Sequence, residues 1–421
     1  MIKIVWLCNV RFTLEKIKFT GSWLQPLAER LQDTGKVQIV NICRANVKSI
    51  LKENLGMIVQ YVLPVRKTKK YGHVPDKLTI SEIIDIVSLE QPNLIHIWGT
   101  ESIWASMNPI LSRSFKTIMD IQGLLAPYSD YYYGGLTNRE IFQSIHLKEL
   151  LMPTRTLYYK RKIFKDRGKQ ETKYLQTFTN ISVQSDWVKN YIGFVVPNSK
   201  IYSTNIILRD GFYKAQPWTY KENKESPIIY SSCAAAVPYK GMHILIKAIS
   251  LLKKKYPNIQ LHLAGQINVG SRLVDGYSIY INKLVRKLGL RDNVYFLGPI
   301  DEDNIINELQ KCNVCVVPSF IETYCLAFAE SMIIGVPTIV SYAGALPEFA
   351  EYNKDALFYN SIDYYTLAGY IDELIQNRDL AQMISTNCRT KRFIENNQQR
   401  VVDNQLSIYQ NVLNKNDYVV I

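Results

Sequence analysis

The sequence predicts an α/β protein built from two doubly wound domains that face a central cleft. Short β-branched runs alternate with helical segments along most of the chain, which is the pattern of repeated β-α-β units in a parallel sheet covered on both faces. A length of 421 residues suits two cores of about 200 residues each rather than one. The alternation is lost once, over residues 206–226. Ligands of such sheets bind outside the carboxyl ends of the strands.

The first half begins with an apolar strand, residues 2–8, followed by a helix whose apolar side chains recur at helical spacing. Further strands are expected at 37–43, 58–65, 94–98 and 115–121, and helices at 79–91 and 102–113. Residues 124–180 are less regular and rich in tyrosine and basic residues, and 181–194 give one more strand and a helix start.

The second half repeats the alternation. Its expected strands are 227–235, 258–265, 293–300, 313–318 and 338–343, and its expected helices are 240–256, 277–290, 302–312, 364–377 and 380–413. We therefore divide the chain into an N-terminal domain, a connection, a C-terminal domain and a last helix that we expect to pack back toward the first domain. These four parts are residues 1–205, 206–226, 227–395 and 396–421.

The composition indicates the cellular compartment in which the protein is expected. No apolar run approaches the roughly 18 to 20 residues of a membrane-spanning helix, and the N-terminus lacks the pattern of a secretory signal. The seven cysteines are an odd number spread along the chain, as expected for reduced thiols. Cys312 and Cys315 form a C-x-x-C without a second pair, so we interpret them as buried structural thiols. We expect a cytoplasmic protein without a transmembrane anchor.

The net charge of +13 is concentrated in the first half, at residues 65–70 and 158–170. Such a field attracts anionic lipid, nucleic acid or a phosphorylated substrate, although it can also be a solvated face. Tyr158, Tyr159 and Phe164 are interleaved with the basic residues, which favours peripheral contact with an anionic membrane surface. No nucleic-acid-binding motif accompanies the basic clusters, so we expect no nucleic-acid partner.

Two glutamates stand eight positions apart in "PSFIETYCLAFAESMIIGVP", residues 318–337. A helix that begins near Tyr324 would direct its free first-turn N–H groups into the cleft, where they suit a phosphate or diphosphate. Glu330 would lie about 9 Å further along the axis and could accept the hydroxyls of a ribose. Glu322 could accept hydroxyls of a sugar at the other end. The alternative is a surface carboxylate in a loop and a helix carboxylate paired with a lysine, and the spacing alone leaves both interpretations open.

The stretch "PSFIETYCLAFAESMIIGVPTIVSYAGALPE", residues 318–348, resembles the E-x7-E segment of the family 4 retaining glycosyltransferases, which have the GT-B fold of two Rossmann-like domains. "VPYKGMHILIKAI", "LHLAG", "LGPI", "NLIHIWGTE" and "ISVQSDWVKNYI" resemble other landmarks of the family in the expected order. The resemblance covers nearly the whole chain and is strongest over 226–350. It implies a metal-independent hexosyltransferase with a donor-binding C-terminal domain and an acceptor-binding N-terminal domain.

The resemblance assigns roles to individual residues. Glu322 would hold the transferred sugar and Glu330 the ribose, while Lys240 would neutralise the departing diphosphate. The remaining donor-side residues are expected to be Thr323, Tyr324, Cys325, Leu326, Gly21 and Gly298. On the acceptor or sugar side we expect Gln122, His96 and Trp98. No metal and no cofactor is implied beyond the donor substrate, a UDP- or GDP-sugar.

The sequence departs from the family pattern at three positions. An arginine expected five residues before Lys240 is Ala235, so diphosphate binding is weaker or another basic residue substitutes. A histidine usual after an N-domain strand is replaced by Gln122, whose amide cannot act as an acid or base. Cys325 stands where glycine is common. The acidic triplet that begins at Asp301 directly precedes a helical run and reads as a helix N-cap rather than a metal site.

These observations predict a retaining glycosyltransferase that transfers a sugar from a nucleotide diphosphate to a hydroxyl of a glycan. The resemblance implies bacterial surface polysaccharide synthesis, such as capsule or lipopolysaccharide, with a lipid-diphosphate-linked acceptor at the inner face of the plasma membrane. Two alternatives remain open. One is a nucleotide-sugar epimerase of the same architecture, and the other is a degenerate, non-catalytic transferase subunit, suggested by Ala235 and Gln122.

Overall fold

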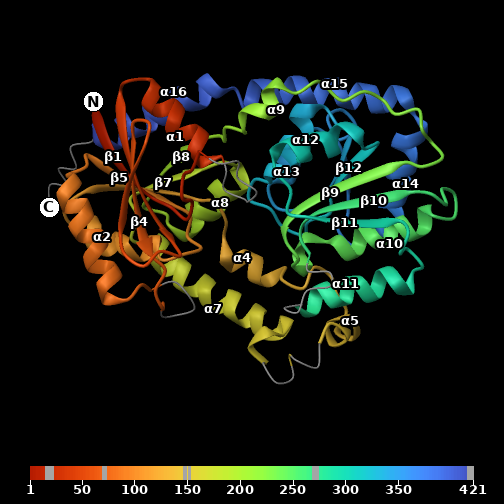
Figure 1. Cartoon of the computed structure of the whole chain (residues 1–421), viewed down its shortest axis with the longest axis horizontal. Coiled ribbons are helices and arrows are strands. Elements are labelled where there is room, and N and C mark those ends of the chain that lie inside the picture. Colours follow the sequence, from red (N-terminus) through yellow and green to blue (C-terminus); the bar gives the residue numbers. More distant parts are fainter. Residues whose placement is uncertain (15–22, 69–73, 146–148, 150–152, 268–274, 415–421) are drawn as a thin grey trace.

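The computed structural model of the protein describes residues 1–14, 23–68, 74–145, 149, 153–267 and 275–414. Two parallel sheets lie beside each other, each with helices on both faces, which confirms the predicted fold class (Figure 1). The strands of the first sheet come from the first half of the chain and those of the second sheet from the second half.

The first sheet has the strand order β3-β4-β2-β1-β5-β6-β7-β8. Its strands are β1 (Ile2–Leu7), β2 (Val37–Ala45), β3 (Leu51–Leu55), β4 (Ile58–Pro64), β5 (Leu94–Trp98), β6 (Lys116–Asp120), β7 (Asn180–Val183) and β8 (Lys200–Ser203). Neighbours pair in parallel except for β3, which runs antiparallel to β4 at the sheet edge. β3 and β8, the two edge strands, were not predicted, because each carries too few apolar residues to form a recognisable run.

Helices cover both faces of this sheet because alternate side chains of its strands point to opposite sides. Ile4 and Trp6 of β1 belong to a core that includes Leu27 of α1, whereas Val5 packs in a core on the other face, which includes α2. The helices of this half are α1 (Leu24–Asp33), α2 (Lys77–Glu90), α3 (Asn108–Leu111), α4 (Leu125–Asp130), α5 (Asn138–Gln143), α7 (Leu157–Leu175) and α8 (Asp186–Val195). The helix expected at 102–113 is instead a 3₁₀ turn followed by the short α3.

The second sheet is fully parallel, with the order β11-β10-β9-β12-β13-β14. Its strands are β9 (Ile228–Ala235), β10 (Gln260–Gln266), β11 (Val294–Gly298), β12 (Val314–Val317), β13 (Thr338–Ser341) and β14 (Leu357–Tyr359). Its helices are α10 (Met242–Leu252), α11 (Gly276–Lys287), α12 (Glu302–Lys311), α13 (Leu326–Ile334), α14 (Tyr364–Gln376) and α15 (Arg378–Glu395). Asp301 caps α12 by accepting a hydrogen bond from the Asn304 backbone, as predicted.

Two segments join the halves. One is the connection that contains α9 (Asp210–Lys214), and the other is α16 (Gln398–Leu413). The single helix predicted over 380–413 is broken at Asn396, whose side-chain amide donates to the Ile206 carbonyl of the connection. In Figure 1, α15 lies over the second sheet and α16 over the first. Tyr409 of α16 contacts His96 of β5, and Lys116 of β6 donates to the last carbonyls of α16.

Within the described part of the chain, none of the helices is long and apolar enough to cross a bilayer.

Candidate active site

A cavity of about 530 Å³ lies between the two halves of the molecule. Its lining comes from segments that follow strands of both sheets, as expected for doubly wound domains. From the first half these include Glu101 after β5, Gln122 after β6 and Gln184 after β7. From the second half they include the ends of β9, β10 and β12 and the start of α13.

The N-terminus of α13 opens into this cavity. The helix begins at Leu326, two residues later than predicted, and its N-cap residue Cys325 has φ 84° and ψ 87°. No side chain caps the helix, and Cys325, Leu326 and Ala327 all line the cavity. First-turn N–H groups without a cap and the positive end of the helix dipole form a site for an anionic group.

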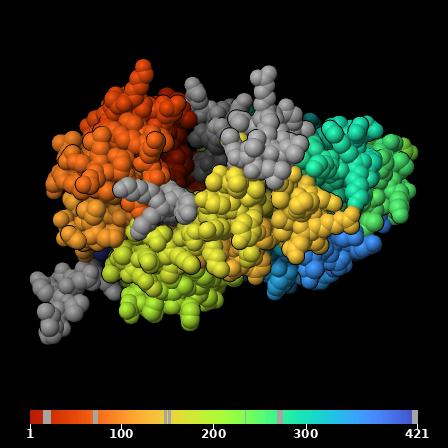
Figure 2. All heavy atoms as spheres, turned by 90° about the horizontal axis from the view of Figure 1, so that it is seen from below, coloured from red at the N-terminus to blue at the C-terminus, as the bar shows by residue number. Residues whose placement is uncertain are grey.

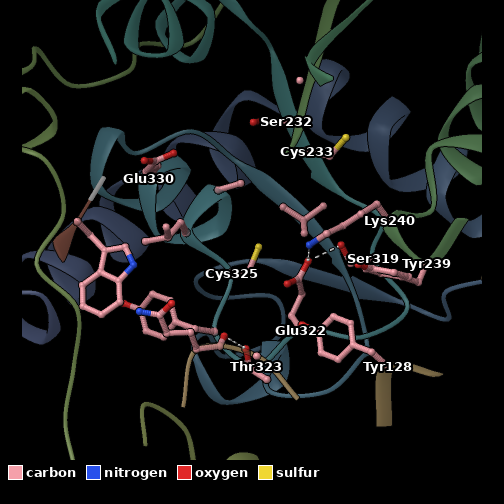
Figure 3. A pocket seen from close by; sticks show the side chains of 18 of the residues that line it. Tyr128, Ser232, Cys233, Tyr239, Lys240, Ser319, Glu322, Thr323, Cys325 and Glu330 are labelled. Atoms are coloured by element: carbon pink, nitrogen blue, oxygen red, sulfur yellow. Dashed lines mark hydrogen bonds and ion pairs between the residues drawn. The ribbon is translucent and has the colours of Figure 1, made fainter. Parts of the chain in front are cut away.

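Lys240 and Glu322 form an ion pair beside this helix end. Their Nζ and Oε1 atoms are 2.5 Å apart, and the two side chains are 21% and 7% exposed. The same oxygen of Glu322 accepts a hydrogen bond of 2.6 Å from the hydroxyl of Ser319. Figure 3 shows Lys240 and Glu322 pointing toward each other, with Cys325 between Glu322 and Glu330 in this view. Burial lowers the pKa of Lys240, but Glu322 and the smaller contributions of Tyr128, Cys325 and Tyr239 together outweigh burial and raise that pKa, so the ammonium form is retained.

The position of Lys240 depends on a close approach of two loops. Gly241 has φ +70°, and a Cβ there would lie 1.8 Å from the carbonyl oxygen of Pro318, at the end of β12. Only glycine permits this contact. The Phe320 backbone N–H also donates to the Tyr239 carbonyl at 2.7 Å. The lysine-glycine turn is therefore fixed against the loop that carries Glu322.

Glu330 lies on α13 and pairs with an arginine that the sequence analysis did not identify. Nη2 of Arg209 is 2.8 Å from Oε1 of Glu330, and each side chain is 11% exposed. Burial raises the pKa of Glu330, and Arg209 opposes this shift. Arg209 belongs to the connection, where no periodicity or motif marked it as a site residue. Both predicted glutamates are thus buried at the cavity rather than directed into bulk water.

Other predicted residues fall into distinct groups. Thr323, Tyr324 and Gln122 line the cavity, and the Thr323 hydroxyl donates to the Gln122 carbonyl at 2.8 Å. Gly298 is not part of the lining, although Pro299 directly after it is. The prediction for Gly21 lies outside the described residues.

His96 and Trp98 do not line the cavity, contrary to expectation. Both belong to β5, where side chains of a central strand are covered by helices on both faces. His96 is fully buried and stacks on Trp98, with Nδ1 2.9 Å from the Tyr409 hydroxyl. Only the residues beyond the end of β5 reach the cavity, and Glu101 is the one that does.

Among the described residues, two arginines line the cavity, although Ala235 occupies the position where the resemblance implied one. They are Arg209 and Arg167, the latter on α7. Cys312 and Cys315 are buried without a disulfide. Within the residues that the structure describes, no three histidine, cysteine, aspartate or glutamate side chains lie together as metal ligands.

Comparison with known sequences matches residues 214–391 to the family model of glycosyl transferases group 1. The chain is 31% identical over 178 residues to an uncharacterized glycosyltransferase, YqgM, of Bacillus subtilis. That alignment covers 42% of this chain and 47% of YqgM, so the chain spans about half the length of this curated relative.

Comparison with solved structures extends over the whole chain. Sucrose-phosphate synthase of Thermosynechococcus elongatus superposes with a TM-score of 0.74 at 17% identity, covering 98% of this chain and 99% of that one. HepE of Anabaena, solved in complex with UDP-glucose, superposes with a TM-score of 0.66 at 14% identity, with coverage of 98% and 99%. The chain therefore has the GT-B fold, and its residues 214–391 are similar to the group 1 glycosyl transferases.

Proposed function

We propose that this protein is a retaining glycosyltransferase that transfers a sugar from a nucleotide diphosphate to a hydroxyl of a glycan. The single observation that carries the proposal is the uncapped start of α13, with Lys240 and Glu322 on one side of it and Glu330 on the other. The similarity of residues 214–391 to group 1 glycosyl transferases supports it. HepE, a structure of the same fold, was solved with UDP-glucose, which supports a UDP- or GDP-sugar as donor.

In this proposal the diphosphate binds at the α13 amides. Lys240 and the helix dipole stabilise the negative charge that develops on the leaving diphosphate, and this charge stabilisation replaces the role that a metal ion has in other transferases. Glu330 accepts the ribose hydroxyls. Glu322 accepts hydroxyls of the transferred sugar and at the same time holds Lys240 in position.

The reaction proceeds with attack on the face from which the diphosphate departs. The bond between the anomeric carbon and the diphosphate oxygen breaks, and its electron pair stays on the diphosphate. The acceptor oxygen forms the new bond, and its proton passes to the departing diphosphate. Because Lys240 stabilises that oxygen most strongly as the bond breaks, it acts on the transition state more than on the bound donor.

The composition of the outer face of α7 favours the proposal that the acceptor is held at an anionic membrane surface. Exposed side chains recur along it at helical spacing, and they are Tyr158, Lys162, Lys165, Lys169 and Lys173. The opposite face of the same helix turns Phe164 and Arg167 toward the cavity. Figure 2, seen from below, shows this yellow segment across the middle of the lower face. A lipid-diphosphate-linked glycan at the inner face of the plasma membrane, as in surface polysaccharide synthesis, fits this arrangement.

Donor binding is tested first by thermal stability in the presence of UDP-, GDP- and ADP-sugars. We expect one class to raise the melting temperature, since a ligand at 100 times its Kd stabilises by about 2.7 kcal/mol. The protein is then incubated with the donor that it binds in three separate reactions: without acceptor, with EDTA, and with glycan acceptors. Rapid release of an epimerised sugar without acceptor would identify an epimerase, and stabilisation by no nucleotide sugar would favour a non-catalytic subunit.

Membrane contact is tested with vesicles that contain an anionic lipid. Each lysine near such a surface contributes about 1 kcal/mol, so reversing Lys162, Lys165 and Lys169 to glutamate should weaken vesicle binding at least a hundredfold. The matched control reverses Lys254, Lys287 and Lys311, three exposed lysines of the second half, and gives the same net charge. Equal losses in both variants would mean that binding follows total charge and not the α7 face.

A further inference from the structure

Glu101 is a half-buried glutamate at the cavity to which the proposed reaction assigns no role. It follows β5 directly and lines the cavity from the side of the first sheet. Among the described residues, its Oε2 atom is covered and has no hydrogen-bond partner, while the half-buried side chain as a whole lines the cavity. An ionisable oxygen without a partner is costly to bury, so its retention in a cavity indicates a ligand.

Two glycines make room for this carboxylate. A Cβ on Gly99 would lie 2.4 Å from Oε2 of Glu101, and a Cβ on Gly123 would lie 2.5 Å from Oε1. Both distances are shorter than real contacts, so any other residue at either position would displace the carboxylate. The backbone after β5 and the backbone after β6 therefore form a slot that fits the side chain of Glu101.

Burial and the neighbouring charges together place the pKa of Glu101 close to neutral pH. Burial raises its pKa to about 7, Glu171 of α7 adds to that shift and Arg167 of α7 opposes it. Arg167 also donates to the backbone carbonyl of Glu101. Asp120 of β6 lies on the sheet side, and Tyr239 approaches from the second half. The carboxylate thus becomes charged as the pH rises through neutrality.

Gln122 provides a donor next to this acceptor. Its Nε2 atom is buried without a partner among the described residues, and its side chain lines the same cavity. Oε1 of Gln122 and Oε2 of Glu101 both lie beside Gly99. A Cβ on that glycine would be 3.2 Å from the first atom and 2.4 Å from the second. The side-chain amide of Gln122, whose Nε2 is an unpartnered donor, thus lies close to an unpartnered carboxylate oxygen. A donor and an acceptor on neighbouring side chains match a hydroxyl group, which donates one hydrogen bond and accepts another.

We infer that Glu101 binds the attacking hydroxyl of the acceptor sugar, with Gln122 donating to the oxygen of that hydroxyl. The inference rests on the proposed transferase function. The pair lies on the first-sheet side of the cavity, whereas Lys240, Glu322 and Glu330 belong to the second half. Glu101 orients the acceptor oxygen toward the anomeric carbon, and the ionised carboxylate binds the hydroxyl more strongly than a neutral group does.

The test uses hydrolysis of the nucleotide sugar that gives the largest thermal shift, with water in the place of the acceptor hydroxyl. We expect Glu101→Gln to lower the hydrolysis rate about tenfold or more while the donor Kd stays within twofold, because a hydrogen bond to a charged group contributes about 1.5 to 3 kcal/mol. The wild-type rate should rise with pH through about 7, and the variant should lose this rise.

Gly123→Ala tests the same slot without changing Glu101 and should reproduce the loss of rate. Its control is Gly193→Ala on α8, where the nearest atom to a Cβ is at an ordinary 3.7 Å. An unchanged rate and pH profile in Glu101→Gln, or an equal loss of donor affinity, would overturn the inference. Failure of every nucleotide sugar to bind the wild-type protein would instead overturn the proposed function.

Discussion

Substitutions in the ion pair between Lys240 and Glu322 should change stability and activity in different ways, which makes the pair a test of the proposed site. The pair is short, at 2.5 Å, and largely buried, with exposed fractions of 21% and 7%. Removing one partner from a buried pair leaves an uncompensated charge and costs about 3 to 5 kcal/mol. Because Lys240 retains some exposure, we expect Glu322→Ala to lose about 3 kcal/mol. For a domain of this size that lowers the melting temperature by roughly 6 to 12 °C.

Replacing both charges by apolar residues should behave differently. Since apolar substitutes for a buried pair are often neutral or stabilising, Lys240→Met combined with Glu322→Leu should be more stable than Lys240→Met alone. Its activity should nevertheless fall by about a hundredfold to a thousandfold, the usual loss when one group that stabilises a developing anion is removed.

The assay combines urea unfolding with the rate of donor turnover for the wild type, for Lys240→Met and Glu322→Leu singly, and for the double variant. The control is Glu373→Ala on α14, an exposed carboxylate distant from the cavity. Strictly additive stabilities, with no coupling between the two positions, would refute the argument that this pair forms in solution.

Three further predictions follow from the site. Cys325→Gly should raise stability by about 1 kcal/mol, since a left-handed backbone is strained for cysteine and not for glycine; an unchanged or lower melting temperature would contradict this. Arg209→Ala should weaken binding of the preferred nucleoside diphosphate about tenfold, because Glu330 loses the cation that keeps it ionised; calorimetry that gives an unchanged Kd would show that Arg209 is dispensable. Finally, burial raises the pKa of Glu101 to about 7, well above that of an unfolded glutamate, so the folded protein binds more protons between about pH 4.5 and 7. The free energy of unfolding should therefore fall as the pH rises through this window, less steeply in Glu101→Gln, and a slope that is identical in the two proteins would exclude Glu101 as its source.

The repeating architecture could be predicted from the sequence because buried parallel strands are nearly continuous apolar runs. β5 was predicted with the bounds that the structure has, Leu94–Trp98. The two edge strands of the first sheet were missed, since half-exposed strands lack such runs. The break of the last helix at Asn396 was also missed, because it depends on a hydrogen bond to the distant connection.

The cavity lining from the second half was predictable because its residues lie within short segments of fixed spacing. Lys240 and Glu322 were both expected, although their mutual ion pair was not. Arg209 and Arg167 could not be found in this way, because each reaches the cavity from a segment whose sequence carries no motif. Their place is set only by the packing of the connection and of α7.

Of the three residues expected on the acceptor or sugar side, Gln122 lines the cavity, whereas His96 and Trp98 do not. His96 and Trp98 were chosen as polar or aromatic members of the landmark "NLIHIWGTE", whose last residue is Glu101. Strand alternation within a covered sheet buries both of them, whereas the residue just past the strand end is free to face the cleft. The end of β5 at Trp98 leaves Glu101, three residues later, as the member of this landmark that lines the cavity.

The central claim, that the start of α13 and Lys240 together bind a diphosphate, is tested most directly by calorimetry with UDP, GDP and ADP and with the matching nucleosides. The account predicts that one nucleoside diphosphate binds at least tenfold more tightly than its nucleoside, and that Lys240→Ala removes this difference while Glu330→Ala weakens both ligands. Equal affinities for diphosphate and nucleoside in the wild type, or a difference that survives in Lys240→Ala, would contradict it.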